Sequence, residues 1–206
     1  MITLLERAMD ILIKNRRPYL ALNVLFYGLI IALMGYSFFD TDLQNRTLEA
    51  NADSFITGAL RLQDKTSVDK EVITTLAGAF FANLLGGSYG GITFPSFVIP
   101  FAGVALGLFR AAQWGIFFCP ANPHIRQILI PHIPTLFIEG QAYILAMLGA
   151  YIQGRAMFWP HSIGKDSRWK AYVEGVRQTG TIYLFIMAML LLSAVYGIVE
   201  MALLIG

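Results

Sequence analysis

The sequence predicts an all-α fold: a polytopic helical membrane protein with about five transmembrane helices plus interfacial amphipathic helices. Of its 206 residues, 56% are hydrophobic and only 14% are charged, and the mean hydropathy is +0.61. Soluble domains average about 45–50% apolar and about 25% charged residues. The apolar residues also gather in blocks close to the ~20 residues that a bilayer core requires. We therefore expect residues 1–206 to form a single helical membrane domain.

The predicted spans are five apolar blocks, at residues 19–39, 72–90, 96–118, 134–158 and 181–205. The first is the clearest, whereas the second is rich in glycine and barely long enough to cross. Only the short link "GITFP" separates the second block from the third, so the two either cross fully as a hairpin or form a re-entrant pair. The four prolines between residues 120 and 134 predict a loop before the fourth span.

Three further segments lie outside these spans. Residues 1–18 carry apolar side chains at helical spacing, which predicts a helix lying in the membrane interface or packed on the protein's own cytoplasmic side. Residues 40–71 form a polar external loop, with a short amphipathic helix expected over residues 48–62. Trp159, Trp169 and the basic residues near them indicate an interfacial stretch with its own amphipathic helix.

The distribution of charge indicates an orientation. With the N-terminus in the cytoplasm, nine of the lysines and arginines lie inside, and the external side holds five bases, most of them diluted by acids. The positive-inside rule favours this arrangement. The formal net charge of +2, with no basic run interleaved with aromatics, excludes nucleic acid as an expected partner.

Small residues form a narrow seam on three of the predicted spans. Lipid supplies no hydrophobic drive for helices to associate, so close contact through small residues has to supply it. We expect such helix packing at Gly86, Gly87, Gly90, Gly103, Gly107, Ala142, Ala146 and Gly149. A substrate path lined by the glycines is the alternative. The same spacing permits a homo-oligomer but also serves packing within one chain.

Polar residues inside the predicted spans are the candidate functional site. A charge near the centre of a membrane helix costs about 2.5–3.5 kcal/mol on insertion scales. We expect an intramembrane polar cluster of Arg110, Glu139, Glu200, His132, Asn83 and Gln153. Arg110 and Glu139 are predicted to form an ion pair, with Glu200 nearby or reaching outward. The cluster either holds helices together, handles a proton or ligand, or contacts lipid headgroups, and the residues alone leave this open.

The residues of an enzyme or a metal site are missing from the sequence. Cys119 is the only cysteine, and the three histidines lack zinc-ligand spacing. No H-E-x-x-H motif or phosphate-binding loop is present, and Ser193 has no histidine in its own or a neighbouring span. We therefore expect no catalytic residue, no metal and no cofactor.

Several motifs resemble one family of membrane proteins. Asn83 precedes the glycine-rich "GGSYGGITF", followed by "GVALG" and by "IPHIPTLFIEGQAYILAMLGAYIQG". Over about residues 72–155 the chain resembles the stage II sporulation protein M family of integral membrane proteins. The positions that match the family pattern are Asn83, Pro131, His132, Glu139 and Ala142. Ile133 stands where the family usually has glycine, and His132 and Glu139 lie about one helical turn further apart.

The resemblance implies a function without catalysis. The founding member acts as the membrane anchor of secreted peptidoglycan-degrading partners, and relatives resemble components encoded with exporters. It implies a multi-pass scaffold or accessory subunit of an envelope or export complex in a prokaryotic inner (cytoplasmic) membrane, bound to the lipid bilayer and to other membrane or envelope proteins. The alternative is a transporter or channel component that moves a solute, peptide or proton through a site at Glu139 and Arg110.

Overall fold

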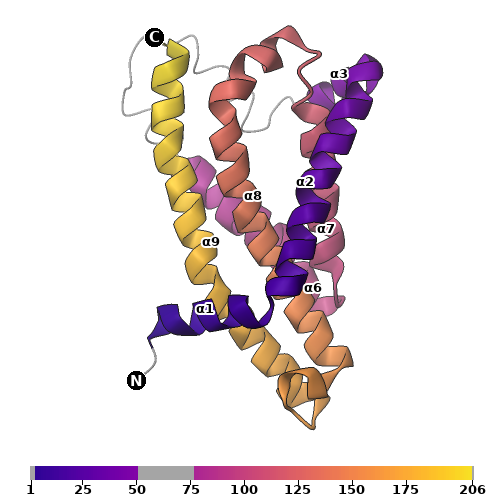
Figure 1. Ribbon diagram of the computed structural model, residues 1–206, viewed down its shortest axis with the longest axis vertical. Helices are drawn as coiled ribbons and strands as arrows, with labels where there is room; N and C mark the ends of the chain where they lie inside the picture. The colour runs from indigo at the N-terminus through magenta and orange to yellow at the C-terminus, as the bar shows by residue number, and fades with distance from the viewer. Residues whose placement is uncertain (1–2, 51–76, 206) are drawn as a thin grey trace.

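The computed structural model describes residues 3–50 and 77–205, and within them every regular element is helical (Figure 1). The predicted all-helical fold is therefore confirmed for this part of the chain. Most of the external helix predicted over residues 48–62, and residues 72–76 of the second span, lie outside it. In chain order the elements are α1 (Leu4–Lys14), α2 (Arg16–Phe39), α3 (Thr41–Ala50), η1 (Ala82–Thr93), α6 (Phe94–Val98), α7 (Ala102–Phe117), α8 (Pro123–Phe158), η2 (Pro160–Ile163) and α9 (Arg168–Ile205).

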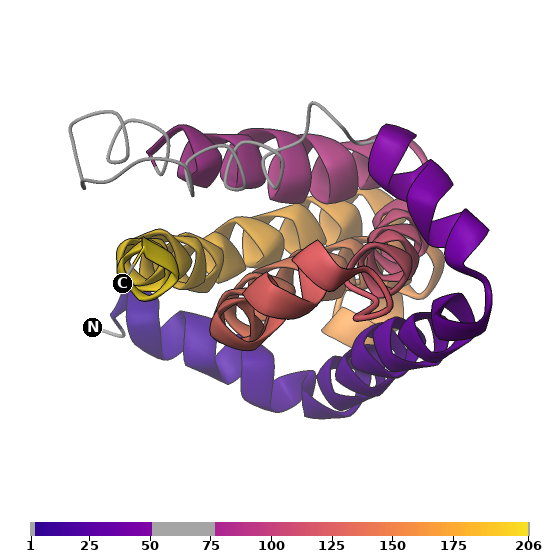
Figure 2. The same ribbon diagram turned by 90° about the horizontal axis from the view of Figure 1, so that it is seen from above.

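Helix α8 is the centre of the bundle. It packs against α9, α2, α7 and η1, and the view along the long axis shows it enclosed by them (Figure 2). Every residue from 140 to 150 is buried. This stretch makes about three turns, so its side chains together point in all directions around the helix axis, and Tyr143, Ile144, Met147 and Leu148 within it are fully buried. A helix that is apolar on every side has to be surrounded on every side.

Three helices of the described chain are long and apolar enough to cross a membrane: α2, α8 and α9. They correspond to the first, fourth and fifth predicted spans. Helix α7 has 16 residues, and the π-helix η1 runs obliquely across the bundle in Figure 1. The membrane class is thus supported by these helices, whereas the count of five spans is not confirmed.

The loop predicted before the fourth span was wrong for most of its length, because helix α8 begins at Pro123. The side chain of Asn122 accepts hydrogen bonds from the amides of His124 and Ile125, which caps the first turn. Pro123 fits this turn because the amide that proline lacks has no helical partner there. Pro131 and Pro134 lie inside the helix, and Tyr196 on α9 donates to the Pro131 carbonyl at 3.0 Å. Neighbouring helices often stabilise proline turns in membrane helices in this way.

The separate amphipathic helix expected near Trp159 and Trp169 was also wrong. A short 3-10 turn, η2, follows α8, and α9 then begins at Arg168 and continues without interruption to Ile205. The basic stretch after Trp159 is therefore divided between a turn and the first turns of a 38-residue helix.

The helix break near the third span lies at residues 99–101, not at the predicted "GITFP" link. Ile99 is extended and Phe101 has a positive φ of 67°, which is uncommon for a residue with a side chain. Two contacts hold this turn. Ser96 Oγ accepts from the Gly103 amide at 2.7 Å. The Phe101 ring stacks on Phe158 with centroids 6.1 Å apart.

Helix α1 lies across the bundle, and the ends of α8 and α9 that η2 joins extend past it (Figure 1). Ala8 is fully buried, and α1 packs against α9. The apolar Leu4, Leu5, Met9 and Ile13 are 45–60% exposed. Helix α1 is thus packed on the protein, and its exposed apolar row also fits the predicted interfacial placement.

Gly103 should be intolerant of a side chain. A methyl group there would collide with the backbone carbonyl of Ile92, and it would lie 2.6 Å from Ser96 Oγ and 2.9 Å from Ala150 Cβ. We predict that Gly103→Ala lowers stability by about 1–3 kcal/mol, the usual cost of overpacking. Thermal unfolding in mild detergent, followed by circular dichroism, measures this change.

Gly180→Ala is the matched control, because no side chain or other helix in the described residues lies within 4 Å of a methyl group placed there. Alanine is the better helix former, by about 1 kcal/mol. This variant should therefore unfold at the wild-type temperature or above it. Equal losses in the two variants would contradict the packing described for Gly103.

Candidate functional site

The carboxylate of Glu139 accepts hydrogen bonds from two other elements. Asn83 Nδ2 on η1 donates to Glu139 Oε1 at 2.9 Å, and Ser193 Oγ on α9 donates to the same oxygen at 3.0 Å. The Tyr143 hydroxyl in turn donates to Asn83 Oδ1 at 2.8 Å. We call Asn83, Glu139, Tyr143 and Ser193 the Glu139 network. It joins η1, α8 and α9 through polar side chains.

Helical geometry explains how α8 supplies two members of the network. Glu139 and Tyr143 are four residues apart and so project from the same face. Tyr143 is fully buried, and its ring fills the space against η1 where Gly87 has no side chain. Neither Tyr143 nor Ser193 was among the residues predicted from sequence. The four-residue spacing from Glu139 was the signal for Tyr143, but Ser193 carries no comparable pattern.

The predicted ion pair between Arg110 and Glu139 was wrong. The guanidinium carbon of Arg110 instead lies 4.5 Å from the centre of the Tyr143 ring, and Arg110 Nε is buried without a hydrogen-bond partner in the described chain. A cation over an aromatic face gains attraction without contact with a carboxylate. Arg110 therefore reaches the Glu139 network through the ring of Tyr143.

His132 and Glu200 form a second polar group. His132 Nδ1 lies 2.7 Å from Glu200 Oε1, and Thr135 Oγ1 donates to Glu200 Oε2 at 2.7 Å. Both side chains of the His132–Glu200 pair are 12% exposed. Thr135 lies one turn before Glu139 on α8, so the two carboxylates sit at neighbouring levels and each links α8 to α9. The histidine predicted at this rim pairs with Glu200 rather than with Glu139.

Gln153 lies apart from these groups. It is 14 residues beyond Glu139 on α8, which corresponds to about 21 Å along the helix. Gln153 Nε2 donates to Thr179 Oγ1 on α9 at 2.9 Å. The expectation that Gln153 joins Asn83 and Glu139 was therefore wrong, because residues that far apart along one helix cannot line the same site.

A further polar network on α8 was missed by the sequence analysis. Gln141 Nε2 donates to Asn23 Oδ1 at 2.8 Å and to the Tyr27 hydroxyl at 3.0 Å, and the Tyr19 hydroxyl donates to Gln141 Oε1. Tyr19, Asn23 and Tyr27 recur every four residues on α2. That spacing was the available signal, since polar residues four apart share one face of a helix.

Most of the predicted small-residue contacts are present. Gly103, Gly107 and Gly149 lie against Ala150, Met147 and Thr179, and Ala142 and Ala146 are fully buried. The prediction was wrong for Gly86 and Gly90. Both are exposed, and no other helix in the described chain lies within 4 Å of a methyl group at either position. Residues 82–93 form a π-helix, whose wider turns shift the buried stripe to Gly87, Ser88 and Ile92.

Comparison of the chain with models of known protein families, with curated proteins and with solved structures found no match. The class of protein therefore rests on the fold and the polar groups described above. Within the described residues, three helices long and apolar enough to cross a membrane, a central helix enclosed by the others and polar side chains paired between helices fit a helical membrane protein.

The Glu139 network makes a quantitative prediction. Asn83 and Glu139 are in direct contact, so the destabilisation caused by Asn83→Ala and by Glu139→Ala should be less than additive in the double variant. Hydrogen bonds between membrane helices contribute about 0.6–2 kcal/mol, which sets the expected coupling energy. Reversible unfolding in detergent measures the four stabilities of the cycle.

The Glu139–Gln153 cycle is the matched control, because these residues share α8 but bond to different groups. Glu139→Ala and Gln153→Ala should be additive within about 0.5 kcal/mol. Additive losses for Asn83 and Glu139 would contradict the network.

Proposed function

We propose that the chain is a non-enzymatic integral membrane scaffold or accessory subunit of a multi-protein envelope or export complex. The observation that carries the proposal is the bonding of Glu139, whose oxygen accepts from η1 and α9 at once. A carboxylate used in this way serves as a fixed contact between helices. The resemblance to the stage II sporulation protein M family supports the same function.

The remaining polar pairs support a rigid bundle. Glu200 uses both of its oxygens on α8 side chains, and Thr179 accepts from Gln153 while donating to the Gly149 carbonyl at 3.1 Å. Breaking such a bond in lipid leaves polar groups with no water to replace the partner. A bundle held in this way offers partner proteins a surface of constant shape.

The apolar outer surface is available to lipid or to a partner helix. On α2 the exposed apolar side chains include Leu20, Val24 and Ile31, which are 60–73% exposed. We place the chain in a prokaryotic inner membrane with its N-terminus in the cytoplasm, as the positive-inside rule favours. Other membrane or envelope proteins are then the expected partners, and a second copy of the chain is a possible one.

One observation favours transport as a second candidate function. Arg110 is partly buried, its Nε has no partner in the described chain, and the nearest carboxylates are bonded elsewhere. An ionisable residue inside a membrane segment is typical of a solute or proton pathway. In this alternative, Arg110 and Glu139 would contact the transported species.

Purification from native membranes separates the two functions. A scaffold should retain a partner protein in stoichiometric amount after mild extraction and affinity purification, as quantified by mass spectrometry. The purified chain should produce no solute or proton flux in liposomes. Glu139→Ala, which loosens the bundle, should reduce partner recovery, and Gly180→Ala should leave it unchanged.

The opposite pattern would support transport. It consists of flux in liposomes that Arg110→Gln abolishes while the unfolding temperature is unchanged, with no partner recovered. That result would overturn the scaffold proposal.

A further inference from the structure

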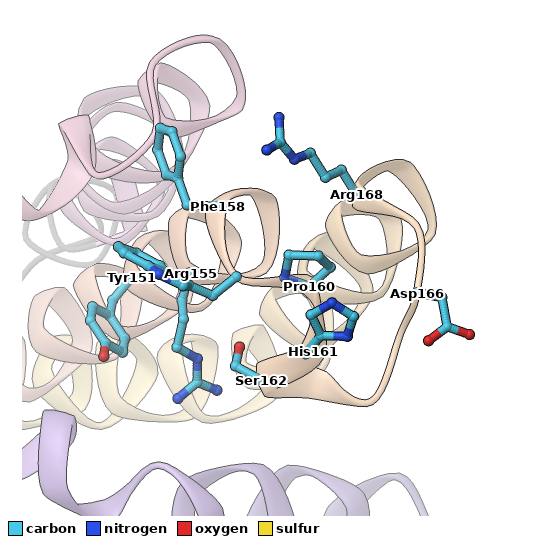
Figure 3. Close-up of a pocket in the computed structure, with 9 residues that line it drawn as sticks. Tyr151, Arg155, Phe158, Pro160, His161, Ser162, Asp166 and Arg168 are labelled. Atoms are coloured by element: carbon cyan, nitrogen blue, oxygen red, sulfur yellow. The ribbon is translucent and has the colours of Figure 1, made fainter.

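A pocket of about 810 Å³ lies at the far end of α8 from the Glu139 network. It is formed by the last two turns of α8, by η2 and by the start of α9 (Figure 3). Arg155, which lines it, is 16 residues beyond Glu139, or about 24 Å along the helix. The pocket is therefore separate from the candidate site described above.

Two arginines supply positive charge on different sides of this pocket. Figure 3 shows the guanidinium of Arg155 next to Ser162, and that of Arg168 directed to the opposite side of the pocket. Within the described residues, neither arginine has a carboxylate oxygen within 4.0 Å. The one acid among the lining residues, Asp166, points away from both guanidinium groups in Figure 3.

Arg155 is held in place, but one of its hydrogen-bond donors has no partner in the described chain. Its Nη2 donates to Asn15 Oδ1, a neutral amide, at 3.0 Å, and its side chain lies 5.6 Å from the centre of the Tyr151 ring. Its Nε is buried and has no hydrogen-bond partner in the described chain. A buried donor without a partner is uncommon and calls for a ligand or water. The hydroxyl of Ser162 and the imidazole of His161 line the same pocket as further hydrogen-bonding groups.

Aromatic side chains give the pocket an apolar rim. Phe158 is 53% exposed and Trp159 is 60% exposed, and both rings pack with Phe101. Exposed tryptophan is typical of the level of lipid headgroups. Asn15, the residue that binds Arg155, also ends α1, the helix that lies across the bundle with its apolar row open. Cations, hydrogen-bond donors and exposed aromatic side chains thus line one pocket, and its Arg155 is bonded to the end of α1.

We propose that this pocket binds the phosphate group of an anionic phospholipid. Arg155, with Ser162 and His161 beside it, binds the phosphate, and Arg168 adds a second positive charge. Phe158 and Trp159 contact the glycerol and the first methylenes of the acyl chains. Guanidinium forms paired hydrogen bonds with phosphate oxygens, which ammonium cannot do. Basic pockets between membrane helices on the cytoplasmic side bind anionic headgroups in other proteins.

The test measures lipid binding to the full chain, delipidated in an uncharged detergent, by native mass spectrometry. Phosphatidylglycerol should bind at least about tenfold more tightly than zwitterionic phosphatidylcholine, and Arg155→Gln and Arg168→Gln should each weaken its binding about fivefold. Arg155→Lys should keep part of the selectivity, because it retains the charge but loses the paired geometry.

Two controls make the outcome decisive. Arg126→Gln removes a cation that donates to the Pro120 carbonyl near the start of α8, and it should leave lipid binding unchanged. Arg155→Gln removes the bond between Arg155 and Asn15, whereas Arg168→Gln keeps it. A loss of lipid binding in Arg168→Gln therefore does not come from breaking that bond. Equal binding of the two lipids, or no effect of either glutamine variant, would overturn the proposal. Inorganic phosphate that binds as tightly as phosphatidylglycerol and displaces it would overturn the lipid as the source of the phosphate.

Discussion

The fold depends on burying polar groups where neither lipid nor water can satisfy them. Glu139 is the sharpest case, because its carboxylate lies on the central helix and its oxygen accepts from both η1 and α9. Once α8 carries this group, η1 and α9 have to approach closely enough to supply the donors. The His132–Glu200 pair and the Gln141 network set the same requirement at other levels and on another face of α8.

Small residues make that close approach possible. Gly107 gives space to Met147, Gly149 to Thr179 and Gly87 to Tyr143, so three neighbours of α8 each meet it where one helix lacks a side chain. Dispersion contacts and polar bonds therefore act at the same interfaces. This combination replaces the hydrophobic drive that is absent between helices in lipid. The same logic unites the predicted glycine seams and the polar residues into one packing arrangement.

The sequence predicted the fold class and much of the packing because both follow from composition and from the period of an α-helix. The prediction failed where a helix departs from the α-helical period or begins at a residue that was assigned to a loop. The π-helix displaced Gly86 and Gly90 from the buried face, and capping by Asn122 started α8 before three of the prolines taken to mark a loop. The contacts that a polar side chain makes were harder to predict than its position on a helix. Arg110 packs over the ring of Tyr143, and Ser193 donates to Glu139. Both contacts depend on how the helices are placed in space, which the sequence does not give.

Cross-linking in native membranes tests the central claim most directly. Asn83 and Ser193 bond to the same oxygen of Glu139, whereas the adjacent Leu192 is 52% exposed on the outer face of α9. In a Cys119→Ser background, Asn83→Cys with Ser193→Cys should be joined by a short bifunctional thiol cross-linker, detectable as a linked peptide by mass spectrometry. Asn83→Cys with Leu192→Cys should not. Equal cross-linking of both pairs, or of neither, would contradict the convergence of η1, α8 and α9 on Glu139.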